Sequence, residues 1–199
     1  MRGSIFDYVG NLDTLIAVIV GACLAIGGAL IAEIVQDRLG RRRRERDAAR
    51  FFGEIISSID QIFDLAAGSM KIGERWGSFT MSVYSVILHE TETYFRNRER
   101  LFDIRDMRLR FAIHGHILRV SAPLASILDV TKSLEELSTR LEEDDALSPR
   151  AVDSLKARIE RLTEFREGGY EGLTEQREVS ASILAELEQI ARAKFDGHY

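Results

Sequence analysis

A long apolar run lies near the start of the chain and dominates its hydropathy pattern. Residues 14–32 contain no charged side chain, and Ile34 and Val35 extend the run. A bilayer core about 30 Å thick needs roughly 20 apolar residues at 1.5 Å each, and a helix satisfies its own backbone hydrogen bonds in hydrocarbon. The run is too long for the apolar part of a cleaved signal peptide. The pattern therefore predicts a transmembrane helix over residues 14–36, preceded by a short interfacial leader over residues 1–13.

After Gly40, apolar residues recur in steps of four and three, which predicts a second helical segment. The repeating positions are Ala48, Phe52, Ile55, Ile59, Ile62 and Ala66, widened by Phe51, Ile56 and Phe63. A stripe this broad is typical of a bundle face rather than of a two-stranded coiled coil. If no break occurs at Gly40, this helix continues the membrane helix.

The middle of the chain contains one clear helix and one ambiguous segment. Gly68, Gly73 and Gly77 punctuate the chain before a helix that begins at Ser78. In residues 107–120, apolar residues alternate with polar ones, which suggests a strand and a hairpin. A helical repeat from Ile113 to Ile127 spans more residues, so we favour a helix that is kinked near Pro123.

The last third of the sequence is typical of helices joined by short turns. Ser148 and Pro149 form a helix start, with a capping residue followed by proline in the first turn. We expect the adjacent Gly168 and Gly169 to end that helix, and a final helix to cover about residues 174–193. Residues 142–145 form an acidic turn ahead of this unit.

These elements define an all-α protein with one transmembrane helix and a cytoplasmic bundle of about four to six helices. A basic juxtamembrane segment, residues 37–50, joins the membrane helix to a helical domain over residues 51–199. The composition agrees, because only two of 199 residues are proline. Cys23 is the only cysteine, so an intrachain disulfide is excluded.

The flanking charges predict how the membrane helix is oriented. The C-terminal flank contains Arg38, Arg41, Arg42, Arg43, Arg44 and Arg46, whereas the N-terminal flank has Arg2 against Asp7 and Asp13. The positive-inside rule then places the N-terminus outside and the C-terminus in the cytoplasm of the cell (inner) membrane, in a single pass. Arg41, Arg42, Arg43 and Arg44 are expected to fix this topology and to contact lipid headgroups. So close to the bilayer they are poorly placed to bind nucleic acid.

The membrane helix also carries a face of small residues and one acidic residue. The small residues are Ala17, Gly21, Ala25, Gly28 and Ala32. Such a stripe lets two helix backbones approach closely and predicts self-association or docking on a partner membrane protein. Glu33 is expected to reach the lipid interface, and its alternative role is a charge in a pore or helix interface.

A second arginine cluster is a candidate anion or ligand site. It comprises Arg96, Arg98, Arg100, Arg105, Arg108 and Arg110, interleaved with Glu99, Asp103 and Asp106. Ion pairs within helices explain most of such a pattern. The alternative is a site for a small-molecule or anionic signal.

The sequence contains no motif that points to catalysis. His114 and His116 are two residues apart, so on a helix they would face different sides and could not hold a metal together. His89 and Glu90 lack the second histidine of a zinc-protease helix. There is no glycine-rich phosphate loop, no nucleophile elbow and no pair of cysteines. We therefore predict a non-enzymatic protein without a cofactor or a metal.

Two functions fit these features. The first is a single-pass membrane protein that self-associates or docks in a membrane complex through its membrane helix and its cytoplasmic bundle. The alternative is a membrane effector or sensor whose bundle binds a signal and drives pore formation or membrane disruption, as in bacterial defence or stress systems. The alternative depends on likeness of architecture alone.

Overall fold

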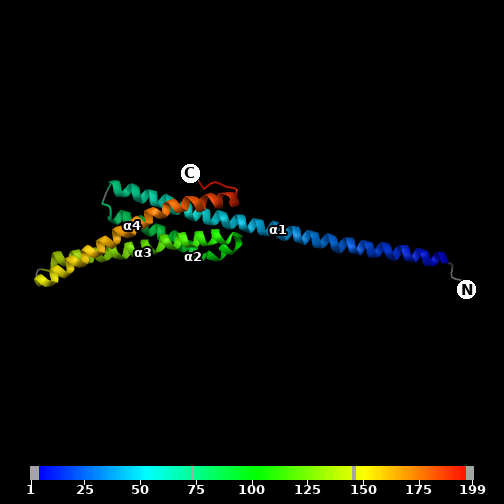
Figure 1. Cartoon of the computed structure of the whole chain (residues 1–199), viewed down its shortest axis with the longest axis horizontal. Coiled ribbons are helices and arrows are strands. Elements are labelled where there is room, and N and C mark those ends of the chain that lie inside the picture. The colour runs from blue at the N-terminus through cyan, green and yellow to red at the C-terminus, as the bar shows by residue number, and fades with distance from the viewer. Residues whose placement is uncertain (1–4, 73, 145–146, 196–199) are drawn as a thin grey trace. The chain divides into compact units, whose positions relative to one another are not determined.

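A computed structural model describes residues 5–72, 74–144 and 147–195 of the chain, with side chains in the first range from Leu15 to Lys71. Within them the order of elements is α1 (Ile5–Ile72), α2 (Ser78–Arg96), a 3₁₀ helix η1 (Arg98–Asp103), α3 (Met107–Glu143) and α4 (Pro149–Ala191) (Figure 1). No strand occurs among the described residues, so the predicted all-helical class is confirmed. The side chains of the predicted leader, residues 1–13, lie outside the described residues.

The chain divides into two compact units, Met1–Arg44 and Glu45–Tyr199. Helix α1 belongs to both, because its helical backbone passes Gly40 without a break. The first unit consists of the N-terminal part of α1. The second is a helical bundle that contains the rest of α1 together with α2, α3 and α4.

The core of the bundle is built by the predicted stripe of α1. Phe52, Ile56 and Ile59 have no exposed surface, and the neighbouring helices supply the residues that cover them. The ring centroids of Phe52 and Tyr94 of α2 are 5.8 Å apart, and those of Phe63 and Tyr84 of α2 are 6.3 Å apart. Burying each large apolar side chain stabilises the fold by about 1.5–3 kcal/mol. Helix packing therefore holds the bundle without a disulfide.

The ambiguous segment, residues 107–120, is helical. Helix α3 begins at Met107, where the Asp106 carboxylate accepts hydrogen bonds from the backbone N–H groups of Arg108 and Leu109 at 2.8 and 3.3 Å. It continues through Pro123 to Glu143. The apolar positions of the helical repeat are buried, and they include Ile113, Ile117, Val120, Leu124 and Ile127.

The prediction that Gly168 and Gly169 end a helix is wrong. Helix α4 runs from Pro149 to Ala191 through both residues, and its N-cap Ser148 accepts a hydrogen bond from the Ala151 N–H as predicted. Glycine destabilises a helix interior by roughly 1 kcal/mol relative to alanine. At Gly169 an added Cβ would make only an ordinary van der Waals contact, at 3.4 Å from the Ile127 side chain of α3. Gly68 likewise lies inside α1 and not in a break.

Helices α3 and α4 lie side by side as a long hairpin (Figure 1). The first turns of α4 carry the predicted apolar residues Val152, Leu155, Ile159 and Leu162, which are only half-buried. In Figure 1 this end of the hairpin extends past the connection between α1 and α2. The acidic residues predicted as a turn lie at its tip, but Glu142 and Glu143 still belong to α3; Asp144 follows the helix, and Asp145 lies outside the described residues. We call the end of the hairpin, residues 134–162, the two-helix arm.

The segment after α4 packs back onto α1. Arg192 ends the helix in a left-handed conformation, with φ of 53°. The carbonyl of Phe195 then accepts a hydrogen bond of 2.7 Å from the Ser57 hydroxyl. The Phe195 ring lies over Gly53, where an added Cβ would come within 2.2 Å of it. Glycine at position 53 is therefore required for this close approach.

Candidate functional site

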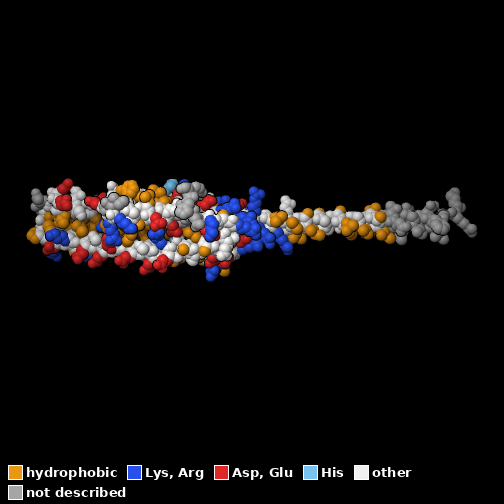
Figure 2. Space-filling view, turned by 90° about the horizontal axis from the view of Figure 1, so that it is seen from above, with side chains coloured by type: hydrophobic (Ala, Val, Ile, Leu, Met, Phe, Trp, Pro, Cys, Tyr) orange, Lys and Arg blue, Asp and Glu red, His pale blue; other side chains and the backbone are white. Residues whose placement is uncertain are grey.

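Two helices are long and apolar enough to cross a membrane, α1 within Leu15–Lys71 and α3 over Met107–Glu143. The two helices differ in burial. In the most apolar stretch of α1 no residue is buried, whereas a third of the residues in the most apolar stretch of α3 are buried. In α1 the large apolar side chains from Leu15 to Val35 are 49–71% exposed. Figure 2 shows these hydrophobic side chains in orange along the N-terminal part of α1. An apolar surface of this length needs lipid or another protein to cover it.

The predicted small-residue face lies on this exposed part of α1. A Cβ added at Gly21 or at Gly28 would meet nothing within 4 Å. The same holds for Gly27. Gly27 lies off the small-residue face, about 120° around the helix from Gly21 at the centre of that face. The single chain thus sets no constraint on these glycines. Glu33 and Cys23 are both exposed on the same helix.

The first arginine group follows where the apolar run ends (Figure 2). Arg41, Arg42, Arg43 and Arg44 are all exposed. Arg41 pairs with Asp37 one turn earlier, at 2.9 Å between Nε and the carboxylate oxygen. Guanidinium groups in such a position suit contacts with lipid phosphates.

The second arginine group does not converge on one point. Arg105 pairs with Glu45 of α1 at 3.4 Å, and Arg108 pairs with Glu186 of α4 at 3.0 Å. Arg100 stacks over the ring of Phe51 at 4.6 Å. These contacts cross between helices, so the expected explanation by pairs within one helix covers only part of the group. Arg98 and Arg110, by contrast, line a common cleft.

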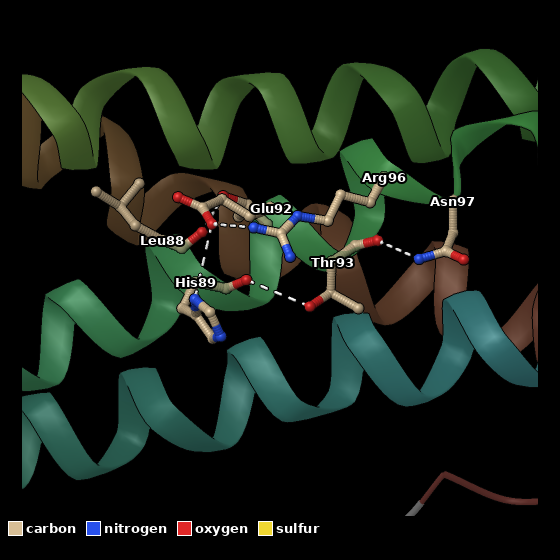
Figure 3. Close-up of polar contacts among 7 residues, drawn as sticks. Leu88, His89, Glu92, Thr93, Arg96 and Asn97 are labelled. Atoms are coloured by element: carbon tan, nitrogen blue, oxygen red, sulfur yellow. Dashed lines mark hydrogen bonds and ion pairs between the residues drawn. The ribbon is translucent and has the colours of Figure 1, made fainter.

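Arg96 belongs to a polar row on the exposed side of α2 (Figure 3). Glu92 lies between His89 and Arg96, with distances of 3.7 Å to His89 Nδ1 and 3.4 Å to the guanidinium. The Asn97 side-chain amide donates to the Thr93 carbonyl at 2.9 Å and closes the helix end. All these contacts lie within one helix and stabilise it by a few tenths of a kcal/mol per pair. The row therefore has a structural role.

A cleft lies where α2, η1 and α3 meet. Its volume is about 780 Å³, and it is lined by Phe95, Arg98, Glu99, Leu101, Phe102, Met107, Arg110, Phe111 and His114. Ile104 at the end of η1 is fully buried, which fixes the short helix and leaves the preceding Phe102 79% exposed. Met107 and Phe111 are 61% and 69% exposed. We call Phe95, Phe102, Met107 and Phe111 the aromatic rim.

Sequence analysis identified the arginines of this cleft but not its apolar side. The aromatic rim was not predicted because Met107 and Phe111 belong to the alternation of apolar and polar residues that suggested a strand in residues 107–120. The signal that could have found it is Phe102, an aromatic residue among charged ones. Only a fold that brings η1 back beside α3 places these side chains together.

His114 lines the cleft and is held in place by the buried Tyr94 of α2. Tyr94 has no exposed surface, and its hydroxyl lies 2.7 Å from His114 Nδ1. The two rings are stacked, with centroids 6.0 Å apart. Burial raises the pKa of the Tyr94 hydroxyl to about 12, although the nearby Arg98 opposes the shift. Tyr94 is therefore neutral and un-ionised at physiological pH.

A polar seam joins α4 to α1. The Ser180 hydroxyl donates to the Asp60 carboxylate at 2.6 Å, and Arg177 pairs with Asp64 at 2.5 Å. Burial raises the pKa of Asp60, and the hydrogen bond from Ser180 opposes that rise. These contacts fix the position of α4 along α1.

A small cavity of about 40 Å³ lies beside this seam. Tyr84, Tyr170 and Arg177 are among its lining residues. The buried Tyr84 hydroxyl has no hydrogen-bond partner among the described residues, and its burial raises its pKa. A water molecule needs about 10–15 Å³. The cavity therefore suits water and not a larger ligand.

A cluster of aromatic rings and guanidinium groups fixes the connection between α1 and α2. Trp76 lies edge-on to Tyr170, with centroids 5.9 Å apart, and its indole N–H donates to Glu167 at 2.8 Å. Arg75 and Arg166 lie 5.4 and 4.4 Å from the Trp76 ring centroid. Each cation–π contact is worth about 0.5–1 kcal/mol at an exposed site. The cluster anchors the connection on α4.

His116 is the least expected polar residue of the core. It is 1% exposed, and neither ring nitrogen has a hydrogen-bond partner among the described residues. Burial, together with the nearby positive charge of Arg119, lowers the pKa of His116 to about 4. His116 is therefore a neutral core residue at physiological pH.

The described residues contain no group of three or more histidine, cysteine, aspartate or glutamate side chains that could hold a metal ion. Comparison with known protein families, with curated proteins and with solved structures found no match to this chain. Its function must therefore be argued from its own residues.

Proposed function

We propose that this chain is a single-pass protein of the cell membrane that assembles with copies of itself or with a partner membrane protein, without enzymatic activity. The observation that carries the proposal is the uncovered apolar surface of α1 between Leu15 and Val35. The arginines at its C-terminal end favour an orientation with the bundle in the cytoplasm.

The argument for assembly starts from the small-residue face. A leucine at Gly21 or Gly28 would meet nothing in the single chain. Any loss caused by such a substitution would therefore arise between molecules, where a small-residue stripe allows close packing. The half-buried apolar residues of the two-helix arm offer a second surface for a partner.

The phase of the helix allows a sharp test by disulfide crosslinking in native membranes. At 100° per residue, the native Cys23 lies about 160° around the helix from Gly21. A disulfide needs Cβ atoms roughly 3.8 Å apart. We therefore expect Gly21→Cys in a Cys23→Ser background to form a crosslinked dimer on oxidation, while the native Cys23 does not. Exclusive monomers with both, and no partner retained on purification, would contradict the proposal.

A matched pair of substitutions tests the same face without crosslinking. Gly28→Leu on the stripe should weaken association measured by energy transfer between labelled chains in vesicles. Gly27→Leu changes the same residue type about 120° from the stripe centre and should have little effect. Equal loss in both variants would show that the stripe is not the interface.

The effector alternative makes a different prediction for the same experiment. Glu33 lies about 120° around the helix from Gly21, so a dimer on the small-residue face leaves it outside the contact. A pore would instead place Glu33 on a shared axis. Crosslinking through Glu33→Cys in a Cys23→Ser background, together with loss of membrane potential on expression, would favour the effector.

A further inference from the structure

The cleft at the meeting of α2, η1 and α3 combines exposed apolar side chains with guanidinium groups. The aromatic rim exposes large apolar side chains around one opening. Arg98 and Arg110 line the same opening, together with Glu99. Apolar rings beside guanidinium groups are typical of surfaces that enter the headgroup layer of a membrane.

The charge around this surface favours an anionic partner. Residues 95–111 contain six arginines against three carboxylates. Glu92, Glu45 and Glu186 pair with three of these arginines, whereas Arg98 and Arg110 line the cleft itself. One of the three carboxylates within the segment, Asp106, caps α3 by accepting two backbone N–H groups. Cationic residues next to a leaflet rich in anionic lipid contribute about 1 kcal/mol each.

Contacts within the bundle tie this surface to the part of α1 nearest the apolar run. The backbone N–H of Arg105 donates to Glu45 at 3.1 Å, and the Arg105 guanidinium pairs with the same carboxylate. Arg100 covers Phe51 of α1. Only residues 36–44 separate Val35 from Glu45, which limits the distance along a helix to about 15 Å. The chain is therefore short enough to hold the surface at the cytoplasmic leaflet.

We propose that the aromatic rim, with Arg98 and Arg110, is a second membrane-binding surface that inserts into the anionic cytoplasmic leaflet and binds lipid phosphates. This inference rests on the proposed membrane anchor. The rings enter the boundary between headgroups and acyl chains, and the two guanidinium groups pair with phosphates above them. The bundle is thus attached to the membrane at two places.

The test is fluorescence quenching in vesicles of phosphatidylcholine and phosphatidylglycerol that contain lipids brominated on the acyl chain. The full chain carries Phe102→Trp in a Trp76→Phe background, so that one tryptophan reports. The matched control is Phe79→Trp in the same background, because Phe79 is 62% exposed but starts α2, at the other end of that helix from Phe95. Since an interfacial segment enters by about 5–10 Å, acyl bromines should quench Trp at position 102 several-fold more than at position 79.

A second pair of variants tests the role of charge. Arg98→Gln with Arg110→Gln, in the reporter chain, should reduce quenching at position 102. Vesicles of phosphatidylcholine alone should reduce it in the unaltered reporter. Arg140→Gln with Arg150→Gln removes two exposed arginines at the end of the two-helix arm and should leave the quenching unchanged.

Alkaline extraction of the same vesicles separates this inference from the anchor on which it depends. Release of the chain would refute the anchor. A chain that resists extraction but shows no quenching at position 102 refutes the second surface alone. A blue-shifted but unquenched Trp at position 102 would also refute it, because a second copy of the chain and not lipid would then cover the rim.

Discussion

Replacing His116 by leucine should remove a specific part of the pH dependence of folding. The imidazole is buried in the bundle with no hydrogen bond to a described residue. Its pKa of about 4 lies below the ordinary value of 6.5. Below pH 6.5 the unfolded chain therefore binds a proton at this residue that the folded chain does not bind until about pH 4. Linkage then requires the free energy of unfolding to fall as the pH is lowered through this window.

The size of the effect follows from the two pKa values. At 1.36 kcal/mol per unit of pKa, the full difference corresponds to at most about 3 kcal/mol. Between pH 7.5 and pH 5.0 the contribution is about 2 kcal/mol. At pH 7.5 the histidine is neutral in both states and contributes nothing through protonation. Leucine there should be neutral or slightly stabilising, because it removes buried polar atoms that lack partners.

The assay is urea unfolding of the full chain in detergent, followed by the fluorescence of Trp76. Trp76 packs on Tyr170 of α4, so its emission reports bundle packing. The free energy of unfolding is measured at pH 7.5 and pH 5.0 for the wild type and for His116→Leu. His89→Leu is the control, because His89 is exposed on α2. Asp60 contributes equally to all three chains and cancels in the comparison.

The reasoning is refuted by one clear result. If the wild type and His116→Leu lose the same free energy on acidification, His116 is not held neutral by burial. A loss of pH dependence in His89→Leu as well would show that the effect is not specific to the buried ring.

Three further predictions concern the packing of the bundle, all measured by the same unfolding experiment. Gly53→Ala should destabilise the fold by about 1–3 kcal/mol because its Cβ meets the Phe195 ring. The loss of stability should nearly vanish in a Phe195→Ala background. If the loss persisted there, the Phe195 ring would not be its cause. Tyr94→Phe should lower the free energy of unfolding by about 1 kcal/mol through loss of the bond to His114. Tyr84→Phe should leave the free energy of unfolding unchanged or raise it, since the Tyr84 hydroxyl has no hydrogen-bond partner among the described residues. Equal losses of stability in the two tyrosine variants would contradict these assignments. Ile117→Ala in the core should remove about 2–5 kcal/mol, whereas Leu118→Ala, at a 43% exposed position, should remove far less.

Helical periodicity predicted most of the fold because each helix buries one continuous face. The α1 stripe around Phe52 and the α3 repeat through Ile117 are buried as expected. The choice of helix for residues 107–120 was correct because the longer repeat reflects a longer buried face. Helix starts were predicted where the chemistry is local, as at Ser148, whose hydroxyl binds its own first turn.

The errors arise where distant residues decide the local structure. Gly168 and Gly169, predicted to end a helix, lie inside α4, which packs along α3 and continues through both residues. The cleft depends on η1 returning beside α3, and no periodicity reveals that return. The buried position of His116 agrees with its place between Ile113 and Ile117 in the helical repeat, one residue before a core position.

The seam between α1 and α4 has a consequence for biosynthesis. Arg177 is made 113 residues after its partner Asp64. At ribosomal rates of 5–20 residues per second, Asp64 of α1 waits roughly 6 to 23 seconds for Arg177 to be made. During that time the part of the α1 surface that α4 covers in the fold is exposed. A nascent chain stalled before Arg177 should therefore recruit chaperones, and release past Ala191 should end that recruitment.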